Sequence, residues 1–147
     1  MPRLTFQLPL VAMAAASLGV AGCAAPVAVE PPAPAQATVS GTVSYPQRIA
    51  LLPGVTLTVR LLDVSRADAP ATILGMYTHV TTGDQVPFAY TIRYSPAAIN
   101  PANSYTVRAE LRDREGGLRW TTDTAVPVIT RGNPTSDVAI TLVQVGG

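Results

Sequence analysis

The chain has 147 residues, a length that suits one domain and is short for two. Ten Arg and no Lys stand against nine acidic residues, so the net charge of +1 gives no sign of a nucleic-acid-binding surface. The lack of Lys excludes a P-loop, a Schiff-base enzyme and a Ser-Lys dyad. The single cysteine, Cys23, excludes an intrachain disulfide and a multi-cysteine zinc or iron–sulfur site.

The first residues of the chain have the order that is typical of a secretory signal peptide. Arg3 gives a basic start, the stretch Leu8–Val20 is apolar and rich in Ala, and small residues follow it. The quartet Val20-Ala21-Gly22-Cys23 resembles a bacterial lipobox, in which the signal is cut before the Cys. In that class the thiol carries a diacylglyceryl group and the new amino group is acylated as well. We therefore predict a signal peptide over residues 1–22 and lipid attachment at Cys23.

Two other interpretations of this segment stay open at the level of sequence. A charge-free run of this length can span a bilayer as an uncleaved anchor, although Pro9 interrupts the run early. Cys23 could also be an ordinary small residue of a plain signal peptide. In lipoproteins of Gram-negative cells, Asp directly after the acylated Cys favours retention in the inner membrane. Ala24 stands there, so the resemblance implies the outer membrane, with the protein on its periplasmic face.

A tether follows over residues 23–37. Its stretch Ala24–Ala37 contains four Pro and a single charged residue, Glu30. Such a segment has little to bury and favours polyproline II; fully extended at about 3.1 Å per residue, it would reach roughly 40 Å. A Pro-rich ligand for another domain is the alternative.

Residues 38–147 alternate between apolar and polar side chains, the pattern of half-buried strands. Strands are predicted over Val39–Tyr45, Val55–Leu61, Thr72–Val80, Phe88–Tyr94, Tyr105–Arg112, Leu118–Thr122, Val126–Thr130 and Val138–Leu142. Pro127 suits an edge strand, and Pro96–Asn103 has room for one helical turn at most.

These segments predict an all-β fold, an antiparallel β-sandwich of seven to eight short strands. A small closed barrel is the alternative. The core is expected on the apolar faces of the strands, with Trp120 as its largest side chain.

The polar residues form no pattern that is typical of catalysis. His79 is the only histidine, it lies on a predicted strand, and no G-x-S-x-G motif accompanies it. A lone strand histidine is more often a surface or hydrogen-bonded residue than a catalytic one. Asp63, Asp68 and Asp84 would bind a cation only if loops brought them together, and their spacing does not resemble a calcium loop. We predict no catalytic residue, no metal and no cofactor.

Three further groups of residues have a structural and a functional interpretation. The alternating charges of residues 108–115 predict a solvated strand face with cross-strand pairs; a recognition patch is the alternative. The trio Thr122, Asp123 and Thr124 is expected to satisfy backbone groups of a turn. The tyrosines are expected in the core with their hydroxyls at its rim, and the alternative is a ligand or peptide groove. They are Tyr90, Tyr94 and Tyr105.

Several strings of residues together resemble the YbaY/YscW family of lipoproteins. They are Gly41–Tyr45, Arg48–Gly54, Asp63–Ala71, Gln85–Phe88, Tyr94–Ile99 and Thr121–Thr124. The resemblance implies a β-sandwich on a lipidated N-terminus. Some members are pilotins of type III secretion, which bind a secretin subunit in the periplasm and guide it to the outer membrane. The loops match the YbaY branch more closely, and the family pattern assigns a role to Cys23 alone.

The sequence thus predicts a non-catalytic binding or chaperone lipoprotein at the periplasmic face of the outer membrane. Its expected partners are the membrane, through the acyl chains, and a secretin or another envelope protein, with no nucleic acid. Two alternatives stay open. One is a structural lipoprotein of the envelope without a dedicated partner. The other is a hydrolase of envelope polymers, which would need two acidic residues converging in a pocket.

Overall fold

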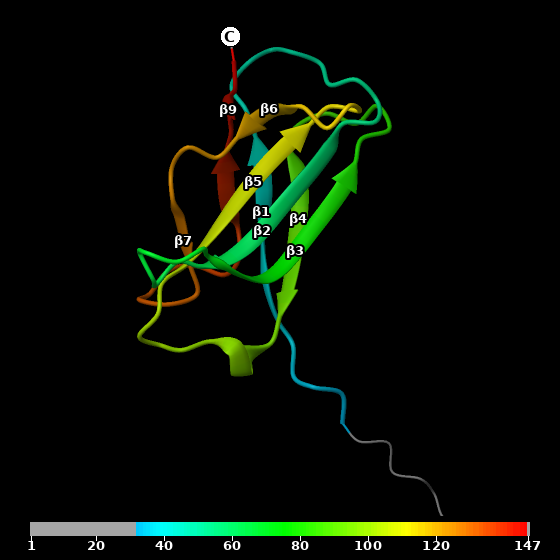
Figure 1. Ribbon diagram of the computed structural model, residues 1–147. Coiled ribbons are helices and arrows are strands. Elements are labelled where there is room, and N and C mark those ends of the chain that lie inside the picture. The colour runs from blue at the N-terminus through cyan, green and yellow to red at the C-terminus, as the bar shows by residue number, and fades with distance from the viewer. Residues whose placement is uncertain (1–31, 147) are drawn as a thin grey trace, which may run out of the picture. The chain divides into compact units, whose positions relative to one another are not determined.

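A computed structural model describes residues 32–146. Figure 1 shows two layers of strands in this part of the chain. The elements are β1 (Ala37–Ser44), β2 (Thr56–Asp63), β3 (Thr72–Val80), β4 (Phe88–Tyr94), the 3-10 turn η1 (Pro96–Ala98), β5 (Tyr105–Arg112), β6 (Leu118–Thr121), β7 (Val126–Val128), β8 (Val138–Thr141) and β9 (Val143–Gln144). No helix in the described part is long and apolar enough to cross a membrane.

The strands form two sheets. One has the order β4-β1-β8, and the other has the order β3-β2-β5-β6-β9, with β7 also paired to β5. The register places Val43 opposite Phe88 in the first sheet and Leu57 opposite Leu111 in the second. The prediction of an all-β sandwich is therefore confirmed.

Two details of the predicted sandwich are wrong. The described residues contain nine strands, one more than predicted. The additional strand is β9, which follows β8 after the single residue Leu142 and pairs with β6 in the other sheet. In addition, β1 and β8 run parallel, with Gly41 opposite Val138. Alternation of side chains shows which face of a strand is buried, but it contains no information on the direction of the neighbouring strand.

The core lies between the two sheets and follows the predicted alternation. Strand β4 alternates strictly between buried and exposed residues from Phe88 to Tyr94. Leu57, Ile92 and Leu111 are fully buried, and Trp120 is 6% exposed. Burial of an aliphatic or aromatic side chain of this size stabilises the fold by about 1.5–3 kcal/mol.

Gly41 explains how β8 fits beside β1. A Cβ atom on Gly41 would lie 1.9 Å from the carbonyl oxygen of Val138. No side chain fits there, so glycine is required for the close approach of the two backbones.

The N-terminal predictions fall largely outside the described residues. This holds for the signal peptide over residues 1–22, for Val20, Ala21, Gly22 and Cys23, and for the tether as far as residue 31. Residues 32–36 have no regular structure, and β1 begins at Ala37.

Candidate functional site

The loop between β1 and β2, residues 45–55, is held by hydrogen bonds from its own Tyr45 and from side chains of two other parts of the chain. We call it the β1–β2 loop. The Tyr45 hydroxyl donates to the Ile49 carbonyl at 2.6 Å. The Gln85 side chain accepts from the Leu51 N–H at 2.7 Å and donates to the Leu51 carbonyl at 3.0 Å. The Gln85 side chain therefore binds both the backbone N–H and the backbone carbonyl of Leu51.

Thr81 and Arg114 fix the second half of the β1–β2 loop. The buried Thr81 hydroxyl donates to the Leu52 carbonyl at 2.9 Å and accepts from the Val55 N–H at 3.1 Å. Arg114 Nε donates to the Pro53 carbonyl at 2.6 Å. Gly54 has a φ of +91°, and a Cβ atom there would lie 2.5 Å from Arg114 Nε, so a glycine is needed for this contact.

The fixed backbone presents apolar side chains to solvent. Leu52 is 75% exposed and Ile49 is 45% exposed, whereas Leu51, between them, is buried. Four carbonyls of this loop accept hydrogen bonds from side chains, so Ile49 and Leu52 stand on a backbone with little freedom to move.

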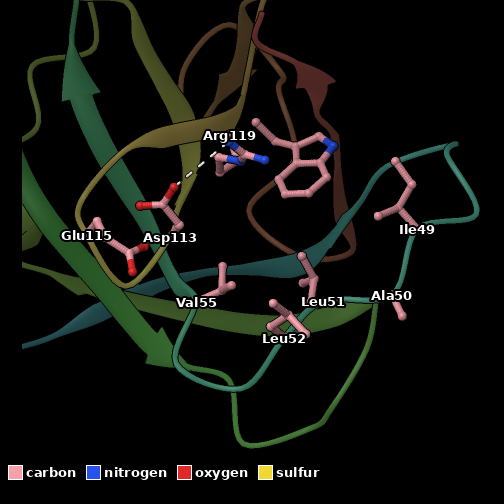
Figure 2. Close-up of a pocket in the computed structure, with 9 residues that line it drawn as sticks. Ile49, Ala50, Leu51, Leu52, Val55, Asp113, Glu115 and Arg119 are labelled. Carbon is pink, nitrogen blue, oxygen red and sulfur yellow. Dashed lines mark ion pairs between the residues drawn. The ribbon is translucent and has the colours of Figure 1, made fainter. Parts of the chain in front are cut away.

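A pocket opens between the β1–β2 loop and the turn that joins β5 to β6. Figure 2 shows the loop residues Ile49, Leu51 and Leu52 on one side and Asp113, Glu115 and Arg119 on the other. The volume is about 360 Å³, at the lower end of the range for ligand sites. A second pocket of about 310 Å³ shares Leu52, Val55, Asp113 and Glu115 with it. We call the two together the loop–turn groove.

Trp120 forms part of the wall of the loop–turn groove. Its ring stacks on Tyr45 with 5.0 Å between centroids and 18° between planes. The buried indole Nε1 has no hydrogen-bond partner among the described residues.

The charges of the loop–turn groove are unevenly paired. Asp113 accepts from the Gly117 N–H at 2.7 Å and lies 4.0 Å from Arg119. The Arg114 guanidinium is engaged with the Pro53 carbonyl. Within the described part of the chain, Glu115 has neither a hydrogen bond nor an ion pair through its carboxylate. The groove therefore combines apolar residues with two carboxylates and two guanidiniums, and the Glu115 carboxylate is exposed to solvent.

The β1–β2 loop, which lines the loop–turn groove, follows the C-terminal end of β1. The chain enters β1 at Ala37, beside Tyr94 of β4, and leaves it at Ser44, directly before the β1–β2 loop (Figure 1). An eight-residue strand is about 26 Å long at 3.3 Å per residue.

The structure places His79 in a pair with Asp84. His79 Nε2 lies 2.5 Å from Asp84 Oδ2, and its ring lies 5.6 Å from that of Phe88. The pKa of Asp84 is lowered, first by the hydrogen bond from the Thr82 N–H and then by the hydrogen bond with His79. As the sequence indicated, His79 is a hydrogen-bonded strand residue.

The aspartates of the predicted loops are not brought together. Asp63 is the last residue of β2 and pairs with Thr72, the first residue of β3. Asp84 comes after the last residue of β3, Val80, which pairs with the first residue of β2. Asp63 and Asp84 therefore lie near opposite ends of this strand pair. Asp63 accepts hydrogen bonds from Ser65 and Asn103, and those from Ser65 are the main cause of its lowered pKa. The described residues contain no group of three or more His, Cys, Asp and Glu placed to hold a metal.

The tyrosines form core and not a groove. Tyr90, Tyr94 and Tyr105 are all buried. The Tyr90 hydroxyl donates to the Val138 carbonyl at 3.1 Å, and burial raises the pKa of Tyr90. The Tyr105 hydroxyl accepts from the Asn100 N–H at 2.8 Å. The core interpretation is the one that the structure supports.

The charged run on β5 forms a face with cross-strand pairs, as predicted. Glu110 pairs with Arg60 of β2 at 3.0 Å and with Arg112 of its own strand at 3.2 Å. At the turn, Asp123 accepts only from the Thr124 hydroxyl, and the backbone of Ala109 is satisfied by Thr122. Within the predicted trio it is thus Thr122 that satisfies backbone groups, and they belong to Ala109 of β5.

The β1–β2 loop was not predicted as a functional site. The one signal in the sequence is the run Ile49–Leu52, which is apolar yet followed at once by Pro53 and Gly54. Two of the strings that resemble the YbaY/YscW family, Arg48–Gly54 and Gln85–Phe88, meet here through Gln85 and Leu51.

The fold and the groove define a β-sandwich domain with a candidate binding site. A sequence profile of the family described as type III secretion system lipoprotein chaperone (YscW) matches residues 34–140. The chain belongs to this family, and the predicted resemblance is confirmed. Membership puts it among the membrane-anchored lipoproteins of the cell envelope, of the chaperone type.

Two known proteins are similar to this chain. The uncharacterized lipoprotein YbaY of Escherichia coli (strain K12) is 38% identical over 117 residues, which cover 80% of this chain and 61% of YbaY. The chain thus spans less than two thirds of that relative. An alternative pilotin from the type II secretion system of Vibrio cholerae has a solved structure with a TM-score of 0.73 and 37% identity. The match covers 77% of this chain and 100% of the pilotin.

Proposed function

We propose that this protein is a lipid-anchored, non-catalytic chaperone on the periplasmic face of the outer membrane. It binds an envelope protein, a secretin subunit first of all, and promotes the assembly of that protein in the membrane. The observation that carries the proposal is the likeness to a pilotin, which extends over the whole of the pilotin chain at 37% identity.

The physical mechanism is tethering. Acyl chains on Cys23 confine the domain to the membrane surface, since more than one chain makes release negligible. A Pro-rich tether keeps the sandwich within roughly 40 Å of that surface. A partner bound to the domain is then held at a high effective concentration beside the membrane in which it assembles.

The bonding of the titratable side chains supports a non-catalytic role. His79 and Asp84 bond to each other, Asp63 closes a loop through Ser65, and Glu110 is shared by two arginines. Each of these groups has a structural use. Asp113 and Glu115 both line the loop–turn groove, but Asp113 accepts from the Gly117 N–H and lies 4.0 Å from Arg119, so Asp113 also has a structural use.

The test is crosslinking in intact cells followed by identification of the crosslinked protein. We expect an outer-membrane protein that forms large assemblies, with a secretin as the leading candidate. A strain without this chain should then contain less of the assembled form in its outer membrane. If no secretin is captured and secretin assembly is unchanged in the deletion strain, the secretin assignment is wrong.

A further inference from the structure

Strand β3 is the outermost strand of the sheet that also contains β2 and β5 (Figure 1), and within residues 32–146 it pairs with β2 alone. We propose that the outer edge of β3 pairs with the same edge of a second copy of this chain. The two strands run antiparallel, centred on Thr78, so that two sandwiches share one continuous sheet. This inference goes beyond the proposed function, because it concerns the association of copies of the chain and needs no other protein.

The backbone of β3 presents unpaired hydrogen-bonding groups along this edge. The Thr81 N–H donates to the Val55 carbonyl at 2.9 Å, so the backbone of Thr81 faces β2. Neighbouring residues of a strand direct their N–H and C=O groups to opposite sides, so those of Met76, Thr78 and Val80 point away from β2. No backbone group in the loops and turns of the described residues bonds these three. The edge therefore offers donors and acceptors in the order that a further strand satisfies.

The composition of β3 distinguishes it from the other edges. Thr72–Val80 contains no Asp, Glu, Lys, Arg or Pro, and its pairing with β2 is regular from Gly75 to Val80. Exposed edges usually carry charges, Pro or a bulge, which keep a further strand from adding. The edge strand β4 carries Arg93, and β7, β8 and β9 have three, four and two residues. In the described part of the chain, β3 is thus the longest edge, and it lacks these protections.

The side chains of β3 are complementary to a second copy of themselves. Antiparallel pairing centred on Thr78 puts Met76 opposite Val80 of the second copy and Thr78 opposite its own counterpart. Met76 and Val80 are 57% and 52% exposed, so each would gain an apolar neighbour. Apolar pairs and threonine pairs both stabilise antiparallel strands, and an uncharged strand does not repel its copy. In this register the three outward-facing residues of each chain bond one another through about six backbone hydrogen bonds.

The geometry of the contact limits the assembly to two chains. Because the same edge is used by both copies, the pairing occupies it fully and cannot continue into a filament. One pair of strands buries little surface, so the association would be weak in dilute solution. The lipid anchor holds copies at one membrane surface and raises their effective concentration; this step alone rests on the proposed function. We therefore expect the dimer at the membrane.

The experiment uses the full chain in membranes from its own cells, with Thr78→Cys as the test variant. Opposed Cα atoms of a hydrogen-bonded pair lie about 5.5 Å apart, within the range of a disulfide. Thr72→Cys is the matched control, because the two copies of this exposed residue of β3 would lie roughly 40 Å apart. Both variants keep Cys23, so a dimer formed through Cys23 contributes equally. After mild oxidation, we expect at least about ten times more disulfide-linked dimer from Thr78→Cys.

A mixture of two variants tests the register. Met76→Cys and Val80→Cys chains with different tags should form a disulfide with each other when coexpressed. Either variant alone should not, since identical residues would lie about 14 Å apart. Adding Thr78→Lys to both chains should lower the yield about tenfold, because two ammonium groups then face each other. Adding Thr72→Lys should leave it unchanged, and circular dichroism with the fluorescence of the only tryptophan verifies folding.

The outcomes separate the dimer from the proposed function. Equal dimer yields from Thr78→Cys and Thr72→Cys, a disulfide from Thr78→Cys to a different protein, or no disulfide between Met76→Cys and Val80→Cys chains would each overturn the β3 pairing. The chaperone role would stand in these cases if partner assembly still required the chain. Conversely, the predicted disulfides in a strain where no envelope protein needs this chain would support the dimer and refute the chaperone role.

Discussion

At the scale of single residues, two threonine hydroxyls bond backbone groups that have no partner on a neighbouring strand. Thr81 satisfies a carbonyl and an N–H of the β1–β2 loop, and Thr122 does the same for the backbone of Ala109. Both side chains are almost fully buried. A threonine hydroxyl can donate and accept at once, and valine has the same shape without this ability.

Replacement of Thr122 by valine should therefore destabilise the protein by about 1–3 kcal/mol, because the buried N–H of Ala109 loses its acceptor. Denaturant unfolding at neutral pH measures the loss. Thr124→Val is the matched control, since the exposed Thr124 hydroxyl contacts only Asp123, and its effect should stay within about 0.5 kcal/mol. Equal effects of the two variants would contradict the role given to Thr122.

Asp84 should contribute to the pH dependence of stability. Its pKa in the folded protein lies below the ordinary value of 3.8, so its contribution is complete above that value and is lost as the pH falls through the folded pKa. Asp84→Asn should lower stability at pH 7 and flatten the decline below about pH 4. Unfolding curves between pH 7 and pH 2 test this. Asp68→Asn should keep the wild-type profile, and a variant of Asp84 that also keeps it would refute the assignment.

At the scale of elements, the strands and their buried faces were predictable, and their arrangement was not. Thr72–Val80 is a strand with the predicted bounds, because alternation of period two is a local property. The parallel pairing of β1 with β8 depends on contacts between residues almost a hundred positions apart, and no local pattern records it. The hydrogen bonds between Leu51 and Gln85 join residues 34 positions apart, so no local sequence pattern could predict the candidate site.

The role of Gln85 in holding the β1–β2 loop can be tested by replacing this residue. Gln85→Ala deletes both hydrogen bonds to Leu51, so the amide of Leu51 should exchange with solvent at least about tenfold faster. Hydrogen exchange followed by NMR measures this rate. Gln144→Ala, an exposed change on β9, should leave the rate as it is. An unchanged Leu51 rate in Gln85→Ala would show that the loop is held by other contacts.

The close approach of β1 and β8 gives a second prediction at this scale. Gly41→Ala would put a Cβ atom 1.9 Å from the Val138 carbonyl oxygen, so the two strands must separate. We expect a loss of at least about 3 kcal/mol, at the upper end for overpacked sites. Ser40→Ala, on the same strand, should be nearly neutral in thermal unfolding. A Gly41→Ala protein of wild-type stability would contradict this pairing.

At the scale of the whole molecule, the proposed function joins three parts of the sequence. They are the predicted lipid on Cys23, the predicted tether over residues 23–37 and the sandwich. The β1–β2 loop, which lines the loop–turn groove, follows the end of β1 opposite to the point where the chain enters that strand (Figure 1).

The anchor itself has a direct chemical test. Mass spectrometry of the mature protein should show an N-terminus at Cys23 with acyl groups on both the thiol and the amino group. Removal of residues 1–22 also removes Arg3, which leaves nine Arg against nine acidic residues. A mature N-terminus at any other residue would refute the lipobox assignment.

The central claim is that the chain acts on its partner because it is fixed to the membrane. The most direct measurement is the amount of assembled partner in the outer membrane of a deletion strain complemented with Cys23→Ser. The variant should be exported and folded, yet restore little of the assembly that the wild-type chain restores. Full restoration by the unanchored variant would contradict the account.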